Sequence, residues 1–243
     1  MLSKSKVKYI QSLGQKKFRD EAGLFIAEGP KIVSELISIC PAQVKEVFAL
    51  EDWLNEHASL LTGCRTEIIS TEELEKISHL KTPNTVLALV SFFGDEQLQL
   101  GGRLSIGLCG IQDPGNLGTI IRIADWFGIS QVICSEDSAD RYNPKVIQST
   151  MGSIARVNVI YTDLEALLRR NTGIPVYATV LDGEDVKTIG RPKEGLILIG
   201  NESKGIPEGI LSLSNRRITI NRKGGAESLN AGVATGIILS HLT

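Results

Sequence analysis

Short apolar runs of strand length alternate along the chain with stretches that have helical spacing. In the first third, the strand-like runs are 24–29, 44–50, 66–70 and 85–92. Between them, apolar residues recur three and four positions apart, as in amphipathic helices, over 30–40, 52–61 and 71–78. Alternating strands and helices are typical of parallel α/β domains, and we expect that architecture here.

The stretch GDEQLQLGGR at 94–103 interrupts this pattern. It is polar, carries glycines and has little apolar surface to pack against a core. We therefore expect a domain boundary here, with a small α/β domain at 1–95, a linker at 96–103 and a second domain at 104–243.

The second domain repeats the alternation with more elements. Its strand-like runs are 104–110, 131–135, 156–161, 174–180, 195–200 and 217–220. Helical patterns lie between them and after the last, at 117–127, 144–151, 163–170, 207–213 and from about Ser228 onward. This order predicts an open sheet covered by helices on both faces.

Composition excludes some classes of protein. Hydrophobic residues make up 42% and charged residues 22% of the chain, with a net charge of −2, as in ordinary globular domains. No run approaches the roughly 18 apolar residues of a membrane span, and no signal peptide precedes the basic start. Four widely spaced cysteines without a CxxC pair favour a reducing compartment and no structural zinc. We expect a cytoplasmic protein without membrane or metal.

The net charge hides a local excess of cations at the start of the chain. No acid occurs before Asp20, whereas the preceding cations are Lys4, Lys6, Lys8, Lys16, Lys17 and Arg19. Such a segment suits contact with a polyanion such as RNA. A solvated amphipathic helix explains the same residues equally well.

Ligands of open α/β sheets bind at the carboxyl ends of strands, where three loops of the second domain carry polar residues. The first loop lies in GIQDPGNLGTIIRIADWFG at 110–128, and Asn116 is well placed to cap the following helix. Arg122 falls opposite the apolar face of that helix, so it is either functional or simply solvated. The apolar face consists of Leu117, Ile120, Ile121, Ala124 and Phe127.

The other two loops follow the strands at 195–200 and 217–220. In the first of them, Asn201 and Glu202 stand directly at the strand tip, before a helix that begins near Pro207. The other contains Gly224 and Gly225 and leads into the last helix, for which Ser228 is a candidate N-cap. Two glycines on one face of that helix suit close packing, either on the sheet or between subunits.

Together, in this order and at these spacings, the three loops resemble the three motifs of the SpoU/TrmH family of the SPOUT superfamily. Its members are RNA ribose 2′-O-methyltransferases that use S-adenosyl-L-methionine. The matching positions are Asp113–Gly118 with Arg122, Gly200–Glu202 with Gly205–Ile206, and Ile220, Gly224 and Ser228–Asn230. The resemblance covers about 104–243. More loosely, KFRDEAGLFIAEGPKIVSELI resembles part of the small RNA-binding α/β domain that often precedes this catalytic domain.

The resemblance implies a fold and a set of site residues. The second domain should be a parallel sheet with a trefoil knot, and the last helix should be buried in a homodimer with a shared site. Arg122 should activate the ribose hydroxyl, with orienting roles for Asn116, Glu202, Ser228 and Asn230. The cofactor should lie at Gly200, Ile220 and Leu229, with Thr179 as a further candidate. Asn221-Arg222 replaces the Pro-Met of many members, which puts side-chain contacts there in doubt.

The expected activity is therefore methylation of a ribose 2′-hydroxyl in RNA, with ribosomal RNA favoured over transfer RNA because of the first domain. The alternatives are a transfer-RNA 2′-O-methyltransferase and an inactive RNA- or ribosome-binding protein of the same fold. Other chemistry has little support. The histidines at 57, 79 and 241 lie far apart in the chain, and no nucleotide-binding glycine motif follows a strand.

Overall fold

The structure, a computed structural model, describes residues 1–94 and 97–243. The chain divides into two compact units. The first contains Met1–Gly94 together with Asp140–Ala155, and the second contains Asp95–Ala139 together with Arg156–Thr243. The expected junction between the first domain and the linker, at 95–96, lies outside the described residues.

The first unit is built on a four-stranded sheet of order β1-β4-β2-β3. β4 is antiparallel to both β1 and β2, and only β2 and β3 are parallel. The expected parallel architecture is therefore wrong for this unit, because apolar alternation reports which face is buried but not the strand direction. The strands are β1 (Leu24–Glu28), β2 (Val44–Ala49), β3 (Thr66–Ile68) and β4 (Val86–Ser91).

Helices cover this sheet. In α3, Ile32, Val33, Leu36 and Ile37 are buried at helical spacing, so one apolar stripe of the helix faces the core. The helical elements are α1 (Lys4–Ser12), α2 (Lys16–Ala22), α3 (Pro30–Ile39), η1 (Pro41–Gln43), α4 (Glu51–Glu56), α5 (Thr71–Ile77), α7 (Pro144–Thr150) and η2 (Ser153–Ala155).

The segment Asp140–Ala155 belongs to the first unit although it follows β6 in the chain. The ring of Tyr142 stacks on Phe92 at 4.0 Å and on Phe25 at 4.9 Å between centroids. Asp140 accepts a hydrogen bond of 2.5 Å from the Arg19 guanidinium. Aromatic stacking and a buried ion pair thus hold this segment to the first unit.

The second unit is built on a six-stranded sheet of order β10-β8-β9-β5-β6-β7. All its strand pairs are parallel, which confirms the predicted parallel α/β fold of this domain. The strands are β5 (Leu104–Cys109), β6 (Gln131–Cys134), β7 (Asn158–Tyr161), β8 (Val176–Asp185), β9 (Gly195–Gly200) and β10 (Arg216–Thr219).

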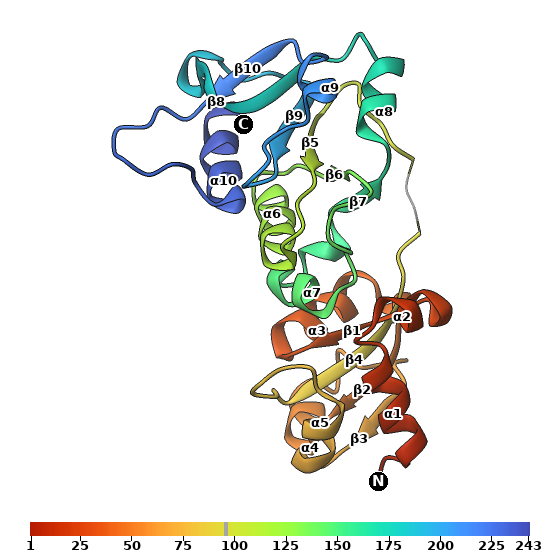
Figure 1. Cartoon of the computed structure of the whole chain (residues 1–243). Coiled ribbons are helices and arrows are strands. Elements are labelled where there is room, and N and C mark those ends of the chain that lie inside the picture. Colours follow the sequence, from red (N-terminus) through yellow and green to blue (C-terminus); the bar gives the residue numbers. More distant parts are fainter. Residues whose placement is uncertain (95–96) are drawn as a thin grey trace. The chain divides into compact units, whose positions relative to one another are not determined.

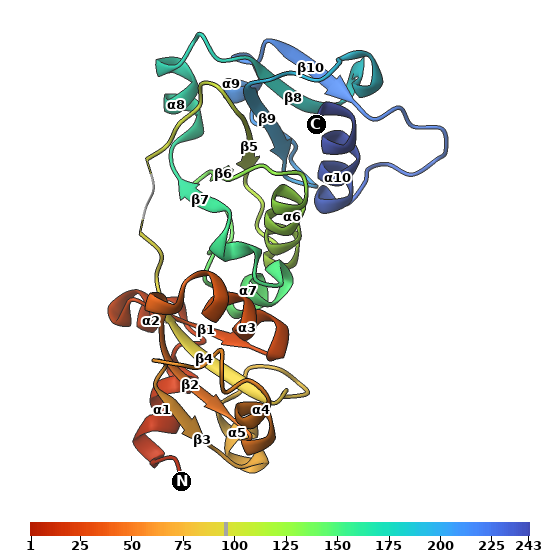
Figure 2. The ribbon, with the colours of Figure 1, turned by 180° about the vertical axis from the view of Figure 1, so that it is seen from behind.

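The helices of the second unit form two pairs, α6 with α10 and α8 with α9, which lie on opposite sides of β5 and β9 in Figure 1. Figure 2 shows the segment between β10 and α10 extending outward from this unit. No helix within the described ranges is both long and apolar enough to cross a membrane. The helical elements are α6 (Pro114–Trp126), α8 (Leu164–Arg170), η3 (Val186–Thr188), α9 (Glu208–Leu211) and α10 (Ala231–Leu242).

Candidate active site

The first and second loops meet because β5 and β9 are neighbours in register. Cys109 at the end of β5 is paired with Gly200 at the end of β9, so both chains leave the sheet at the same level. The Asn201 side chain then donates a hydrogen bond of 2.7 Å to the carbonyl of Gly110. Residues 91 positions apart in the chain are thus joined at the carboxyl edge of the sheet.

Helix α6 begins earlier than the sequence indicates. Asp113 is its N-cap and accepts a hydrogen bond of 2.9 Å from the Asn116 backbone N–H, while Pro114 occupies the first turn. The predicted cap at Asn116 is therefore wrong. Because Asp113 caps the helix, the Asn116 side chain lies in the first turn with its amide available for other contacts.

A chain of hydrogen bonds links the three motifs. Asn116 Nδ2 donates to Glu202 Oε1, and Asn230 Nδ2 donates to Asn116 Oδ1 at 2.8 Å. Asn230 Oδ1 in turn accepts the backbone N–H groups of Gly232 and Val233 at 3.0 and 3.3 Å. Because an amide oxygen only accepts and its nitrogen only donates, these bonds set the orientation of both asparagine side chains.

The last helix begins at Ala231 with Asn230 as its N-cap. The predicted start near Ser228, with Ser228 as the cap, is therefore wrong. Ser228 and Leu229 lie on the segment before the helix, and both are exposed. Of the predicted catalytic residues, Asn116, Glu202 and Asn230 come together, whereas Ser228 stays outside their hydrogen bonds among the described residues.

Arg122 lies on α6, six residues after Asn116, and is exposed. The predicted apolar face of the helix is confirmed at Leu117, Ile120, Ile121 and Ala124, which are all buried. Thr119 and Ile123 lie against Gly232 and Gly236 of α10. Within the described ranges, no hydrogen bond or ion pair joins Arg122 to Asn116, Glu202 or Asn230. In the isolated polypeptide, the Arg122 side chain is therefore exposed to solvent.

Gly200 is required by the shape of its own loop. The loop closes on itself through a bridge between Asn201 and Gly205, and Asn201 Oδ1 accepts the backbone N–H groups of Ser203 and Lys204. A Cβ at position 200 would lie 2.6 Å from the carbonyl carbon of Gly205. The nearest obstacle to a side chain is therefore the protein backbone.

We expect the substitution Gly200→Ala to lower the free energy of unfolding by about 1–3 kcal/mol, as other overpacked sites do. It should also weaken any ligand that contacts this loop, because the backbone must move. Denaturant unfolding and ligand titration measure the two effects. Gly224→Ala is the matched control, since a Cβ there meets no atom within 4 Å. Equal stability of the two variants would contradict the steric explanation.

Ile220 follows β10 and borders a cavity of about 370 Å³ beside η3 and α10. Asn221 lines the same cavity and donates a hydrogen bond of 2.6 Å to Asp185, while the Arg222 guanidinium donates to the Ala226 carbonyl at 3.1 Å. Both residues of the Asn221-Arg222 departure thus make contacts within this region. Thr179, the weaker candidate, is half-buried on β8.

Cys109, at the end of β5, is unsuited to nucleophilic catalysis. Burial, with a smaller contribution from Asp137, raises the pKa of its thiol to about 12. At neutral pH the thiol therefore stays protonated, and the reactive thiolate is scarce. In the described part of the chain, no group of three or more His, Cys, Asp or Glu side chains is arranged to hold a metal ion.

Two of the six predicted RNA-binding cations are engaged inside the first unit. Arg19 is only 2% exposed and donates hydrogen bonds to the carbonyls of Leu13 and Gly14 as well as to Asp140. Its prediction as a phosphate ligand is wrong, because the buried guanidinium cannot reach a ligand on the surface. Lys6 is half-buried and paired with Glu46. The others are exposed, namely Lys4, Lys8, Lys16 and Lys17.

The fold and the site define a parallel α/β domain whose polar residues converge at the carboxyl edge of the sheet, beside its last helix. Comparison with known proteins identifies the family to which a domain of this class belongs. Residues 103–240 match the SpoU rRNA Methylase family, and residues 4–88 match the MRM3-like substrate binding domain. The chain belongs to the SpoU rRNA methylase family, which confirms the resemblance and the predicted class of enzyme.

Individual relatives match along the whole chain. The chain is 30% identical over 240 residues to the Bacillus subtilis 23S rRNA (guanosine(2553)-2'-O)-methyltransferase RlmP, which covers 98% of this chain and 95% of the relative. It also superposes on an AdoMet-bound rRNA methyltransferase from Sinorhizobium meliloti with a TM-score of 0.86 and 30% identity, over 99% of this chain and 95% of that one. The similarity thus includes both units.

The sequence analysis assigned no supporting role to Asp113, Asn201 or Asp140. Asp113 and Asn201 shape the loops that carry Asn116 and Glu202, and Asp140 pairs with Arg19. Asp113 and Asn201 are visible in the sequence as motif residues, and their positions beside a turn and at a strand tip are the signal that could have indicated these roles. The pairing of Arg19 with Asp140 had no local signal, because 121 positions separate the two residues.

Proposed function

We propose that this protein methylates a ribose 2′-hydroxyl of ribosomal RNA, with S-adenosyl-L-methionine as the methyl donor. The observation that carries the proposal is the hydrogen-bonded chain from Glu202 through Asn116 to Asn230. It joins the three family motifs at the edge where α/β sheets bind ligands. The full-length similarity to a 23S rRNA enzyme supports ribosomal RNA over transfer RNA.

The residues near Ile220 fit the cofactor. The cavity there is lined by the apolar side chains of Val186, Ile220 and Ile237, by the hydrogen-bonded pair Asp185 and Asn221, and by the basic side chains of Lys187, Lys223 and His241. Its volume of about 370 Å³ lies within the range of small-molecule sites. The apolar side chains suit an adenine ring, and the polar and basic ones suit the hydroxyl and carboxylate groups of the cofactor. Gly200, Ile220 and Leu229 would hold the cofactor, with Thr179 as a further candidate, and of these Ile220 lines the cavity. The bound sulfonium would supply an activated methyl group.

The protein must then align the ribose oxygen and stabilise the charge that develops on it. Arg122 is suited to hold the adjacent phosphate and to stabilise the developing alkoxide. An arginine guanidinium stays protonated at neutral pH, so this role is electrostatic. Asn116, Glu202 and Asn230 form a fixed polar support for the ribose, and Ser228 would join them when the segment before α10 closes over the bound ligands.

The active form is a homodimer in this proposal. Arg122 is exposed, and among the described residues it makes no hydrogen bond to Asn116, Glu202 or Asn230. In a dimer, the Arg122 of one chain would complete the site of the other. Trp126 on α6 is 84% exposed, and Leu229 and Val233, next to and within α10, are exposed as well. Large apolar side chains exposed on one helix pair favour burial against another subunit.

The remaining features follow from family membership. We propose residues 1–95 as the RNA-binding domain, 104–243 as the catalytic domain and a trefoil knot in the latter. The exposed cations at the start of the chain would bind RNA phosphates, and the protein would work in the cytoplasm, where ribosomes are assembled.

The test combines cofactor binding with product mapping. We expect calorimetric titration with S-adenosyl-L-methionine to show one site per chain, and incubation with rRNA and labelled cofactor to give a ribose 2′-O-methylated nucleotide. Ribosomal RNA from cells that lack the gene is the substrate of choice, because its target is unmodified. Absence of heat on titration would indicate an RNA-binding protein without catalysis, and labelling of transfer RNA alone would overturn the rRNA assignment.

A further inference from the structure

The turn between α1 and α2 lies against the loop that follows α5. A Cβ at Gly14 would lie 2.5 Å from Cε1 and 2.9 Å from Nδ1 of His79, so the imidazole occupies the space that a side chain at position 14 would need. Gln11 also donates a hydrogen bond of 2.7 Å to the carbonyl of Lys76. These contacts join two segments that are 65 positions apart in the chain.

A buried carboxylate holds this loop in place. Glu28 on β1 is only 5% exposed, and it accepts hydrogen bonds from the Ser78 hydroxyl at 2.5 Å and the His79 N–H at 2.9 Å. The Ser78 hydroxyl also accepts the N–H of Leu80 at 3.1 Å. The loop therefore presents its side chains from a fixed backbone, which lowers the entropy cost of binding.

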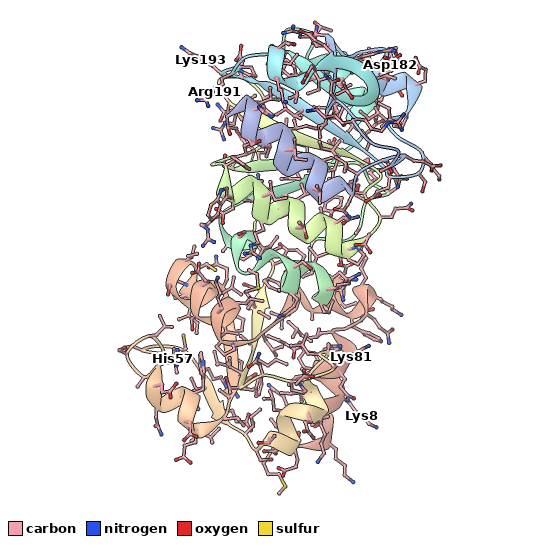
Figure 3. All side chains as sticks on the ribbon, turned by 90° about the vertical axis from the view of Figure 1, so that its left-hand side faces the viewer. Lys8, His57, Lys81, Asp182, Arg191 and Lys193 are labelled. Atoms are coloured by element: carbon pink, nitrogen blue, oxygen red, sulfur yellow. The ribbon has the colours of Figure 1, made fainter. Side chains whose placement is uncertain are left out.

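Each of the two segments carries exposed basic side chains. Lys8, Lys16, His79 and Lys81 are all exposed, and Figure 3 shows Lys8 and Lys81 directed outward on the same side. Within 1–94 and 97–243, no carboxylate lies within ion-pair distance of Lys8, Lys16 or Lys81. By contrast, the neighbouring Lys17 is paired with Glu21 at 4.0 Å. Exposed cations without carboxylate partners favour an anionic ligand.

We propose that Lys8, Lys16, His79 and Lys81 form one RNA-binding surface, which we call the Gly14 surface, and that it contacts the phosphates of the substrate RNA. This rests on the proposed function and adds the loop after α5 to the binding site. Tyr9 and Phe18 expose aromatic rings on the same two helices, where unpaired bases can stack. These rings favour RNA over an acidic protein, which would offer no bases.

The triple variant Lys8→Gln/Lys16→Gln/Lys81→Gln of the full chain tests this surface. Binding of fluorescein-labelled oligouridylate is followed by anisotropy over a series of salt concentrations. Each lost phosphate contact on a single strand lowers the slope of log K against log salt by about 0.7. We therefore expect the slope to fall by about 2, with unchanged cofactor affinity by calorimetry.

A second triple variant, Lys45→Gln/Arg191→Gln/Lys193→Gln, removes the same charge from exposed positions elsewhere and should keep the slope of the unmodified chain. If both triple variants keep the slope of the unmodified chain, or if both lower it by the same amount, the Gly14 surface is not the binding site. Loss of binding to polyglutamate but not to RNA would assign the surface to an acidic protein instead. Failure of the unmodified chain to methylate rRNA is a separate result, which concerns the proposed function alone.

Discussion

The substitution Arg122→Ala should lower the rate of methyl transfer by about 10²–10³-fold, as the loss of one group that stabilises a developing oxyanion does elsewhere. The affinity for S-adenosyl-L-methionine should stay unchanged, because the cofactor residues lie on other loops. Arg122 is exposed, so the variant should fold normally. Single-turnover transfer of a labelled methyl group, with calorimetry for the cofactor, measures both quantities.

The matched control is Arg170→Ala, which removes an exposed arginine from α8 and should leave the rate unchanged. Arg122→Lys separates a specific role of the guanidinium from one of positive charge alone. If Arg122→Lys folds and keeps full turnover, the catalytic assignment of Arg122 is wrong.

Mixed dimers locate the site that Arg122 serves. If Arg122 acts on the site of the partner chain, Arg122→Ala and Asn116→Ala chains should complement each other, because each mixed dimer then has one site without either substitution. Statistical mixing of the two variants should restore about a quarter of the activity of the unmodified dimer. No recovery after verified subunit exchange would show that Arg122 acts within its own chain.

The substitution Arg19→Ala should lower the free energy of unfolding of the first unit by about 3–5 kcal/mol, which is typical when one partner of a buried ion pair is removed. It leaves Asp140 without its cation and the carbonyls of Leu13 and Gly14 without a donor. Urea unfolding in a Trp126→Phe background reports on this unit, because the remaining tryptophan, Trp53, is buried within it.

Lys17→Ala is the control for Arg19→Ala. Lys17 is exposed and pairs only loosely with Glu21, at 4.0 Å, so its loss should change the free energy of unfolding by less than about 1 kcal/mol. By contrast, Lys17→Ala should weaken RNA binding more than Arg19→Ala does, because Lys17 faces solvent and Arg19 does not. If Arg19→Ala is as stable as Lys17→Ala, the structural role of Arg19 is wrong. The predicted role of Arg19 in RNA binding would then need a direct test.

Sequence patterns predicted the second unit well because parallel strands buried on both faces are nearly continuous apolar runs. The β5, β6 and β9 runs and the buried stripe of α6 were all visible. The resemblance to the family motifs also pointed to Asn116, Glu202 and Asn230, which the structure brings together. That they bond to one another could not be predicted, because it depends on the register of β5 with β9 and on the packing of α6 with α10.

The failures at Arg19 and β4 share one cause, which is that local spacing carries no information on distant partners. Arg19 looks like a surface cation in the sequence, yet it is buried because Asp140 and two carbonyls compensate its charge. Asn116 and Ser228 both look like helix caps, but the neighbours Asp113 and Asn230 fill those positions. The antiparallel β4 likewise depends on which strands pair, and the periodicity of single strands does not specify this.

The bond from Asn230 to Asn116 has a consequence for protein biosynthesis. Asn116 and Glu202 precede Asn230 in the chain, so a nascent polypeptide whose translation has passed Glu202 but not α10 holds two members of the polar network without the third. In such a chain, Asn116 Oδ1 lacks the hydrogen bond that Asn230 donates. If these residues have the roles proposed above, a chain synthesised only as far as Glu202 has an incomplete polar network, which forms once Asn230 and α10 have been added.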